Sequence, residues 1–341
     1  MEYIRVFQSQ QDAEQQLAQI THPTLSAIRG ESGVMLRQGP PPNPNIICTY
    51  DVTNTTNPTK LLGSSSRTSE FNKMWIDGVE QQAVVDTYIF GAIGEHTVEY
   101  ELVDNTTVKN SPWWKCTDLT SITFPNSVIT IGESCCSGCS KLSNLVIPDS
   151  VTSIGVGAFG SCTSLTNLTI PDSVTNIGNV AFGGCTSLIN IIVDSNNPAY
   201  DSRNNCNALI ETSTNTLLKG SVNTIIPNTV TSIYLSAFNS MLGLTQVVIP
   251  DSVKTIGQAA FQHCHNVSSV VVGTGVESIE QAAFNNCIGL TSFTCMALTP
   301  PTLGPYPLSS TNDCPIYVPA ESLDLYKSAW SGYASRIQAI Q

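Results

Sequence analysis

The sequence predicts a mainly β solenoid of stacked 23-residue repeats, with short helical turns between its strands. The clearest observation is a column of cysteines that recurs at a constant step of 23 residues: Cys116, Cys139, Cys162 and Cys185, then Cys264 and Cys287. Self-similarity at one fixed period of this size indicates a solenoid, in which each repeat is one structural unit. No single repeat can bury its own apolar face, so the repeats must stack and identical columns must lie over one another.

Other residue types repeat with the same period as the cysteines. A small residue and Phe precede most of the cysteines, as in Ala158-Phe159 and Ala181-Phe182. Isoleucine, valine and proline columns run through the same region: Ile131, Ile154, Ile177, Ile233, Ile256 and Ile279; Val128, Val151, Val174, Val230, Val253 and Val276; Pro125, Pro148, Pro171, Pro227 and Pro250. So many columns in agreement indicate seven to eight coils.

One repeat can be assigned from its own residues. Asn144–Ile147 alternates in the way that a half-buried strand does, with Leu145 and Ile147 on one side. Pro148 ends that strand because it has no N–H to give to a ladder. Val151–Ile154 then predicts a second short strand, and Ala158–Cys162 predicts a tight helical turn.

These columns resemble the repeat of the BspA-like leucine-rich repeat family. The pattern L-x-x-L-x-I-P-x-x-V-x-x-I-x-x-x-A-F-x-x-C is matched by Leu142–Cys162 and again by Leu165–Cys185, and the resemblance covers about residues 116–310. It implies a leucine-rich-repeat solenoid and a bacterial or protist surface protein that acts in adhesion. The family motif marks core positions, so it implies no catalytic residues and no cofactor.

The period holds only in part of the chain, which predicts four regions. Alternation in Thr97–Leu102 and the turn signal Asp77-Gly78 predict an all-β region before the solenoid, reminiscent of immunoglobulin-like modules. A cap is expected at the end because the last coil would otherwise expose its apolar face. The predicted regions are an N-terminal attachment segment with a Pro-rich linker (1–43), a small β-sandwich-like domain (44–112), the solenoid (113–310) and a C-terminal cap (311–341).

The period breaks once, between Cys185 and Met241, which lie 56 residues apart. Two short apolar runs in this stretch predict a β-hairpin insertion at about 194–222 that protrudes from the stack. Because loops carry function more often than scaffolds do, Tyr200, Asp201 and Arg203 are candidate binding residues. The alternative is a structural bulge that re-seats the next coil.

A second candidate surface is the outward side of the strands. Its positions include Asn144, Asn167, Asn190 and Gln246, and its columns contain almost no charge and no aromatic residue. A flat face of this kind suits a protein partner better than a glycan, and the alternative is a solvated wall without a partner. If glycans bind, the expected places are the insertion and the aromatic residues upstream of the solenoid, Trp75, Tyr88, Trp113 and Trp114. For Trp113-Trp114 we favour a different role, as a plug at the N-terminal end of the solenoid.

Composition narrows the partners further. Only 12% of residues are charged, the net charge is −12, and the 14 Lys and Arg form no basic cluster. Binding to nucleic acid or to anionic membrane surfaces is therefore disfavoured, because both need concentrated positive charge. No stretch approaches 18 consecutive apolar residues, so no membrane insertion is expected. The expected partner is a protein or a host surface component.

The twelve cysteines have two readings. Coils about 4.8 Å apart lie within the Cα range that a disulfide needs, so bridges between coils are conceivable. A column of inward-pointing side chains nevertheless favours buried, reduced thiols that act as small apolar groups. His263-Cys264-His265 suggests a metal, but Cys264 belongs to that buried column, so no metal site is expected.

No catalytic motif accompanies the repeats: the chain has no phosphate-binding glycine loop, nucleophile elbow or HExxH sequence. We therefore expect a non-enzymatic adhesion or recognition protein at the cell surface or outside the cell. The first residues, Met1–Arg5, are not followed by the apolar core of a secretion signal. Either such a signal was removed, or the protein is a structural or host-recognition component of a phage or phage-tail-like particle, which needs none.

Overall fold

The structure is a computed structural model that describes residues 4–7, 25–30, 33–38 and 45–341. Strands β1 (Ile4–Phe7), β2 (Leu25–Gly30) and β3 (Gly33–Gln38) form a small antiparallel sheet in the order β1-β3-β2. The predicted Pro-rich linker lies outside the described residues.

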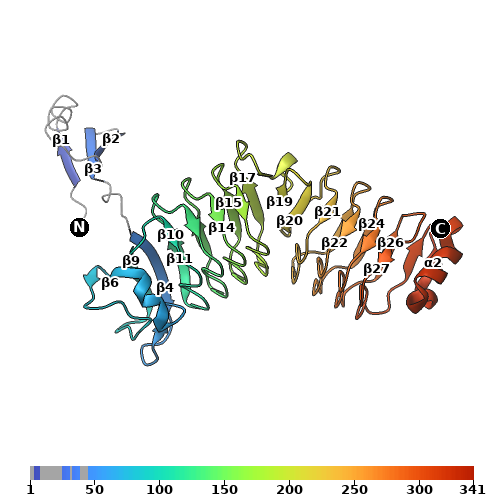
Figure 1. Ribbon diagram of the computed structural model, residues 1–341, viewed down its shortest axis with the longest axis horizontal. Helices are drawn as coiled ribbons and strands as arrows, with labels where there is room; N and C mark the ends of the chain where they lie inside the picture. Colours follow the sequence, from blue (N-terminus) through green and yellow to red (C-terminus); the bar gives the residue numbers. More distant parts are fainter. Residues whose placement is uncertain (1–3, 8–24, 31–32, 39–44) are drawn as a thin grey trace.

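From residue 104 onward the chain winds into coils that lie side by side along an arc (Figure 1). Each regular coil contributes one longer and one two-residue strand, and equivalent strands pair in parallel at a step of 23 residues, as in Asn167 with Asn190. The longer strands are β11 (Leu119–Thr123), β13 (Asn144–Val146), β15 (Asn167–Ile170), β17 (Asn190–Val193), β22 (Gln246–Ile249), β24 (Ser269–Val272) and β26 (Ser292–Cys295). The short strands are β10 (Thr107–Val108), β12 (Thr130–Ile131), β14 (Ser153–Ile154), β16 (Asn176–Ile177), β21 (Ser232–Ile233), β23 (Thr255–Ile256), β25 (Ser278–Ile279) and β27 (Thr302–Leu303). The predicted mainly β solenoid is confirmed.

The cysteine column has a specific task in the core. The Sγ of Cys162 donates a hydrogen bond to the carbonyl oxygen of Cys136 in the preceding coil, at 3.3 Å. The same bond recurs 26 residues back at each regular step: Cys139 to Trp113, Cys185 to Phe159, Cys264 to Phe238 and Cys287 to Phe261, at 3.0 to 3.1 Å. The thiol is thus a second donor to a buried carbonyl oxygen that also accepts a bond within its own turn, as Cys136 O does from Cys139 N at 3.1 Å.

All twelve cysteines are buried and unpaired, which confirms the interpretation as reduced thiols. Burial raises the pKa of Cys264 to about 11 and that of Cys287 to about 12, because a thiolate is poorly solvated inside the stack. Protonated thiols are the form that can donate to the carbonyls.

Two further ladders follow the same step. The rings of Phe261 and Phe284 stack with centroids 5.1 Å apart and planes within 2° of parallel, and Phe238 stacks on Phe261 at 4.8 Å. In the turn that precedes each cysteine, backbone amides bond from coil to coil, as from Phe159 N to the carbonyl oxygen of Ala181 at 2.8 Å. Thiols, rings and amides therefore require one common register between neighbouring coils.

The region before the solenoid differs from the prediction. Strands β4 (Asn45–Val52), β6 (Phe71–Ile76), β7 (Val79–Glu80) and β9 (Gly94–Leu102) join β11 and β13 in one six-stranded sheet, ordered β13-β11-β4-β9-β6-β7. The other elements here are β5 (Thr59–Lys60), which pairs with β8 (Thr87–Tyr88), and the 3-10 helix η1 (Ser65–Glu70). The immunoglobulin-like module is not supported, because a two-residue pair makes no second sandwich layer. Alternation predicts the strands but not the sheet that they join.

This N-terminal sheet closes the first end of the stack. Strand β4 pairs antiparallel with β11 and so covers the open edge of the first coil. Trp113 is fully buried and lies 5.8 Å from the rings of both Phe71 and Tyr100, while Trp114 is exposed. Lys141 bonds Asp51 and Asp118 across the same junction.

The other end is closed by the last thirty residues. Strands β28 (Ile316–Val318) and β29 (Ile337–Ala339) extend the sheet in parallel, and between them lie η3 (Ala320–Ser322), α2 (Leu323–Ala329) and η4 (Ser331–Arg336). Tyr326 is buried and donates to the carbonyl oxygen of Ala297, and Trp330 Nε1 donates to that of Pro301. Both side chains cover the apolar end of the last coil.

The break in the period contains β18 (Tyr200–Asp201), the 3-10 helix η2 (Arg203–Asn205), β19 (Ala208–Glu211) and β20 (Thr216–Gly220). Strands β19 and β20 form the predicted hairpin, but the hairpin does not protrude. Strand β20 pairs in parallel with β21, and Ala208, Ile210 and Leu217 are buried. The hairpin stays within the stack because its two apolar runs can be buried only there. We call this junction, residues 194–222 with the coil turns on either side, the seam.

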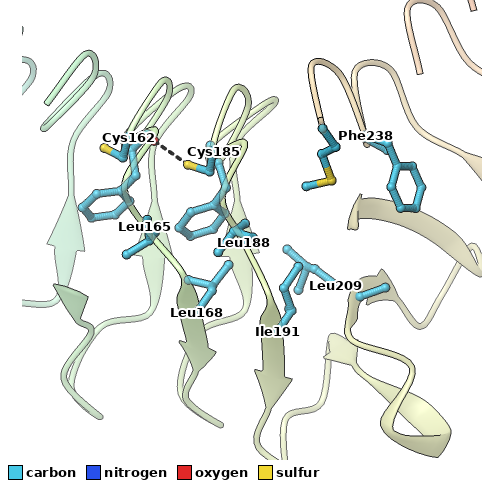
Figure 2. Close-up of a cluster of buried hydrophobic side chains, with 14 of the residues drawn as sticks. Cys162, Leu165, Leu168, Cys185, Leu188, Ile191, Leu209 and Phe238 are labelled. Atoms are coloured by element: carbon cyan, nitrogen blue, oxygen red, sulfur yellow. Dashed lines mark hydrogen bonds between the residues drawn. The ribbon is translucent and has the colours of Figure 1, made fainter. Parts of the chain in front are cut away.

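The core ladders stop at the seam. Figure 2 shows the Cys162 and Cys185 coils on one side, with the Cys185 hydrogen bond dashed, and Phe238 on the other side. The column residue of the first coil after the seam is Met241, which cannot donate. Sulfur donors thus occur where a regular preceding coil supplies the acceptor.

The thiol arrangement makes a direct prediction. No cysteine of the native protein should react with an aromatic disulfide reagent, whereas all twelve should react in concentrated guanidinium chloride, because burial keeps the reagent from every thiol. Absorbance of the released thiolate measures the number. Fast native reaction of several thiols, or fewer than twelve after unfolding without reductant, would contradict the arrangement.

Candidate functional site

The outward side of the longer strands presents a row of amides on three successive coils, with one further amide beyond the seam. Side chains alternate along each strand, so inward residues such as Leu168 and Ile191 enter the core and their neighbours face solvent. Asn144, Asn167, Asn190 and Gln246 are all exposed, at the outward positions that the sequence predicts. The Nδ2 of Asn190 donates to Asn167 Oδ1 at 2.8 Å, and that of Asn144 donates to Ser121 Oγ at 3.2 Å.

Two residues further along the same strands runs an exposed aliphatic row, at positions that the alternation of the sequence also predicts to face outward. Val146 is 52% exposed, Ile192 55% and Val248 64%, with Val271 beside them on the next coil. Exposed Thr123 and Thr169 complete the row. We call the amide row and the aliphatic row together the strand face.

The strand face combines apolar side chains with uncharged polar ones. Aligned strands hold its side chains in register, and amide-to-amide bonds restrain part of the Asn row. Contiguous exposed apolar side chains bordered by polar groups are typical of surfaces that bind another macromolecule.

The three candidate residues of the insertion lie elsewhere and contact the protein itself. Tyr200 is only 4% exposed, and its hydroxyl accepts a hydrogen bond from the backbone N–H of Ile177 at 2.9 Å. Arg203 forms a salt bridge with Asp201, with 2.6 Å between Nη2 and Oδ2, and its Nη1 donates to Asn215 Oδ1. The Tyr200 contact joins the insertion to the preceding coil, and these Arg203 contacts lie within the insertion.

A pocket lies at the seam, apart from the strand face. This pocket of about 430 Å³ is enclosed by the turn of the upstream coil, by the hairpin and by the first downstream coil. Its lining includes Val180, Phe182, Leu209, Leu218, Lys219 and Leu235.

Lys219 is the unusual member of this lining. It lies two residues after Leu217 on the same inward side of β20, and it is 3% exposed. Its Nζ has no hydrogen-bond partner among the described residues. Burial lowers the pKa of Lys219 to about 8, although the Cys185 and Cys264 thiols nearby act in the opposite direction. Sequence reasoning missed this residue, whose only signal is a lysine at an inward strand position.

Metal ligands do not gather in the part of the chain that the structure describes. His263 and His265 both contact the side-chain amide of Asn286, at 2.7 and 3.2 Å, and Cys264 between them is buried. None of the helices in the described ranges combines the length and apolar character needed to cross a bilayer.

The stacked coils, the Leu, Ile and Phe columns and the strand face together define a leucine-rich repeat protein. The family model for the BspA type leucine rich repeat region matches residues 106–218 and 218–329, with six copies. The chain belongs to this family. The expected membership is thereby confirmed for the solenoid.

Solved structures of similar fold come from bacteria. A leucine rich cell surface protein from Faecalibacterium prausnitzii A2-165 is 26% identical, with a TM-score of 0.54, over 67% of this chain and 61% of that one. The pneumococcal vaccine antigen PcpA is 18% identical, with a TM-score of 0.46, over 69% and 68% of the two chains. A leucine-rich repeat protein from Eubacterium ventriosum ATCC 27560 is 19% identical, with a TM-score of 0.45, over 62% and 69%. No curated protein matches the chain.

Replacing Lys219 by Met should stabilise the protein at pH 7, because the variant removes a buried charge without a partner. The native-state pKa of Lys219 lies below its value of 10.5 in the unfolded chain, so the unfolded state binds more protons between these values. Wild-type stability should therefore gain up to about 3 kcal/mol from pH 8 to pH 10.5 relative to Lys219→Met, at ~1.4 kcal/mol per pKa unit.

Urea unfolding of both proteins at pH 7 and pH 10 measures this difference. The tyrosines and the cysteines other than Cys185 and Cys264, which are the two that feel the charge of Lys219, titrate alike in the two proteins and cancel. The control is Lys254→Met, which removes an exposed lysine paired with Glu277 and should change stability by less than about 0.5 kcal/mol. Equal stability of the wild type and Lys219→Met at both pH values would show that the amine carries no such penalty.

Proposed function

We propose that this chain is a non-enzymatic recognition module of a bacterial cell surface, and that it binds a protein partner through the strand face. The observation that carries the proposal is the strand face itself, a rigid row of exposed amides beside a row of exposed aliphatic side chains. Family membership and the similarity to a cell surface protein of Faecalibacterium prausnitzii support the location.

A protein partner fits this surface better than a glycan does. Its exposed groups are Val146, Ile192, Val248 and the Asn row, and the one aromatic residue in register with them, Tyr317, lies on the cap strand β28 at the end of the row. The absence of charge also favours a partner that is recognised by shape and apolar contact. A protein interface of standard size covers about 800 Å² on each side, an area that several adjacent strands can supply.

The test places charge in the centre of the face. Val146→Lys with Val248→Lys should weaken binding to the chain's protein partner at least tenfold, since each lysine would have to be desolvated in the complex. Both positions are exposed, so the fold should persist. Surface plasmon resonance against purified host fibronectin, fibrinogen, laminin, collagen and mucin finds the partner and measures the loss.

Leu325→Lys is the matched control, because Leu325 is 54% exposed on α2 of the cap, away from the strand face. It should bind as the wild type does. Equal binding by the double variant would refute the strand face as the site. Fractionation of the producing cells supplies the second arm: signal in the envelope supports the proposed location, and signal that sediments with extracellular particles favours the phage-like alternative.

A further inference from the structure

The seam interrupts the amide ladder of the coil turns and leaves three backbone donors open, those of Val180, Phe182 and Gly184. In the preceding coil, Gly157 N and Phe159 N donate to the carbonyl oxygens of Asn179 and Ala181, at 3.1 and 2.8 Å. The equivalent amides one coil later belong to Val180 and Phe182. Neither has a hydrogen-bond acceptor among the residues that the structure describes, because the insertion replaces the coil that would supply it. Both residues line the seam pocket.

Beside the same pocket lies a buried ammonium group that has no hydrogen-bond partner among the described residues. Lys219 reaches the pocket from β20, and its Nζ is buried and lacks any partner in the described ranges. The Cys264 thiol close by has a raised pKa because it is buried, whereas the hydrogen bond from Cys162 and the charge of Lys219 lower the pKa of Cys185; neither thiol is a hydrogen-bond partner of Lys219 Nζ. Glu211 also lines the pocket, yet no salt bridge joins it to Lys219. A buried ammonium with this environment is costly unless an anion accompanies it.

The remaining lining is mostly apolar. Leu209, Leu218 and Leu235 contribute aliphatic surface, and the hydroxyl of Tyr234 donates to Asn179 Oδ1 at 2.9 Å, which joins the two sides of the seam. Most small-molecule sites combine such apolar walls with a few polar groups that fix the orientation of the ligand. At about 430 Å³ the volume suits a compound with one ring or a short chain.

We propose that the seam pocket binds a small organic carboxylate with an apolar body, with Lys219 as the counter-ion and the amides of Val180 and Phe182 as further donors. The carboxylate takes the positions that the carbonyl groups of a regular coil would occupy. The apolar body lies against the three leucines. This site is separate from the strand face and does not depend on its function.

Binding is tested with benzoate on the full chain, by calorimetric titration and by the shift of the melting temperature. Benzoate should bind saturably to the wild type and to Lys254→Met, and at least tenfold more weakly to Lys219→Met. Benzylamine, similar in size but cationic, should not bind. Acetate and succinate should bind less tightly than benzoate, because they lack its apolar ring.

A second variant guards against a general effect of the lysine replacement. Leu218→Trp fills the pocket and keeps the amine, so it should also abolish binding while the circular dichroism spectrum stays that of the wild type. The proposal is overturned if no carboxylate of the set binds at millimolar concentration. It is equally overturned if Lys219→Met binds benzoate as tightly as the wild type, or if benzylamine binds as well as benzoate.

Discussion

The common register of 23 residues between neighbouring coils is the constraint on which the rest of the structure depends. Parallel strand pairing, the bond from each thiol to the preceding coil, the stacked phenylalanine rings and the turn amides all require that same step. Each contact is weak alone, on the order of 1 kcal/mol for a hydrogen bond. They reinforce one another because a single displacement satisfies all of them, and stability then accumulates from coil to coil.

A shared register also means that one irregular coil breaks every ladder together. At the seam the ring stack stops between Phe182 and Phe238, Met241 takes the cysteine position, and the amides of Val180 and Phe182 lose their acceptors. The hairpin repairs part of this loss, since β20 pairs with β21 and Gly220 N donates to the carbonyl oxygen of Ala237. The seam pocket lies around Lys219, where the hairpin does not replace the lost contacts. The strand face, by contrast, is a product of the regular coils.

Much of the fold could be predicted from the sequence because the period reports on burial directly. The cysteine column gave the coil length, the inward side chains and the reduced thiols, and strand alternation placed Asn144 and Asn167 outward. The period says nothing where it fails. Tyr200 lies 23 residues after Ile177 and occupies a core position. Its local composition instead suggests a binding residue in a loop. Lys219 and the sheet joined by β4 depend on contacts between distant segments, and no local pattern encodes them.

Hydrogen exchange followed by mass spectrometry tests the central claim most directly, because it reads the amide ladder coil by coil. Amides of the turns in regular coils, such as Phe159 and Phe261, should be protected for hours, since each is bonded to the next coil. Peptides that cover Val180–Gly184 should exchange much faster without any loss of the fold. Protection of this turn equal to that of residues 157–161 would show that the register continues through the seam and would contradict the account.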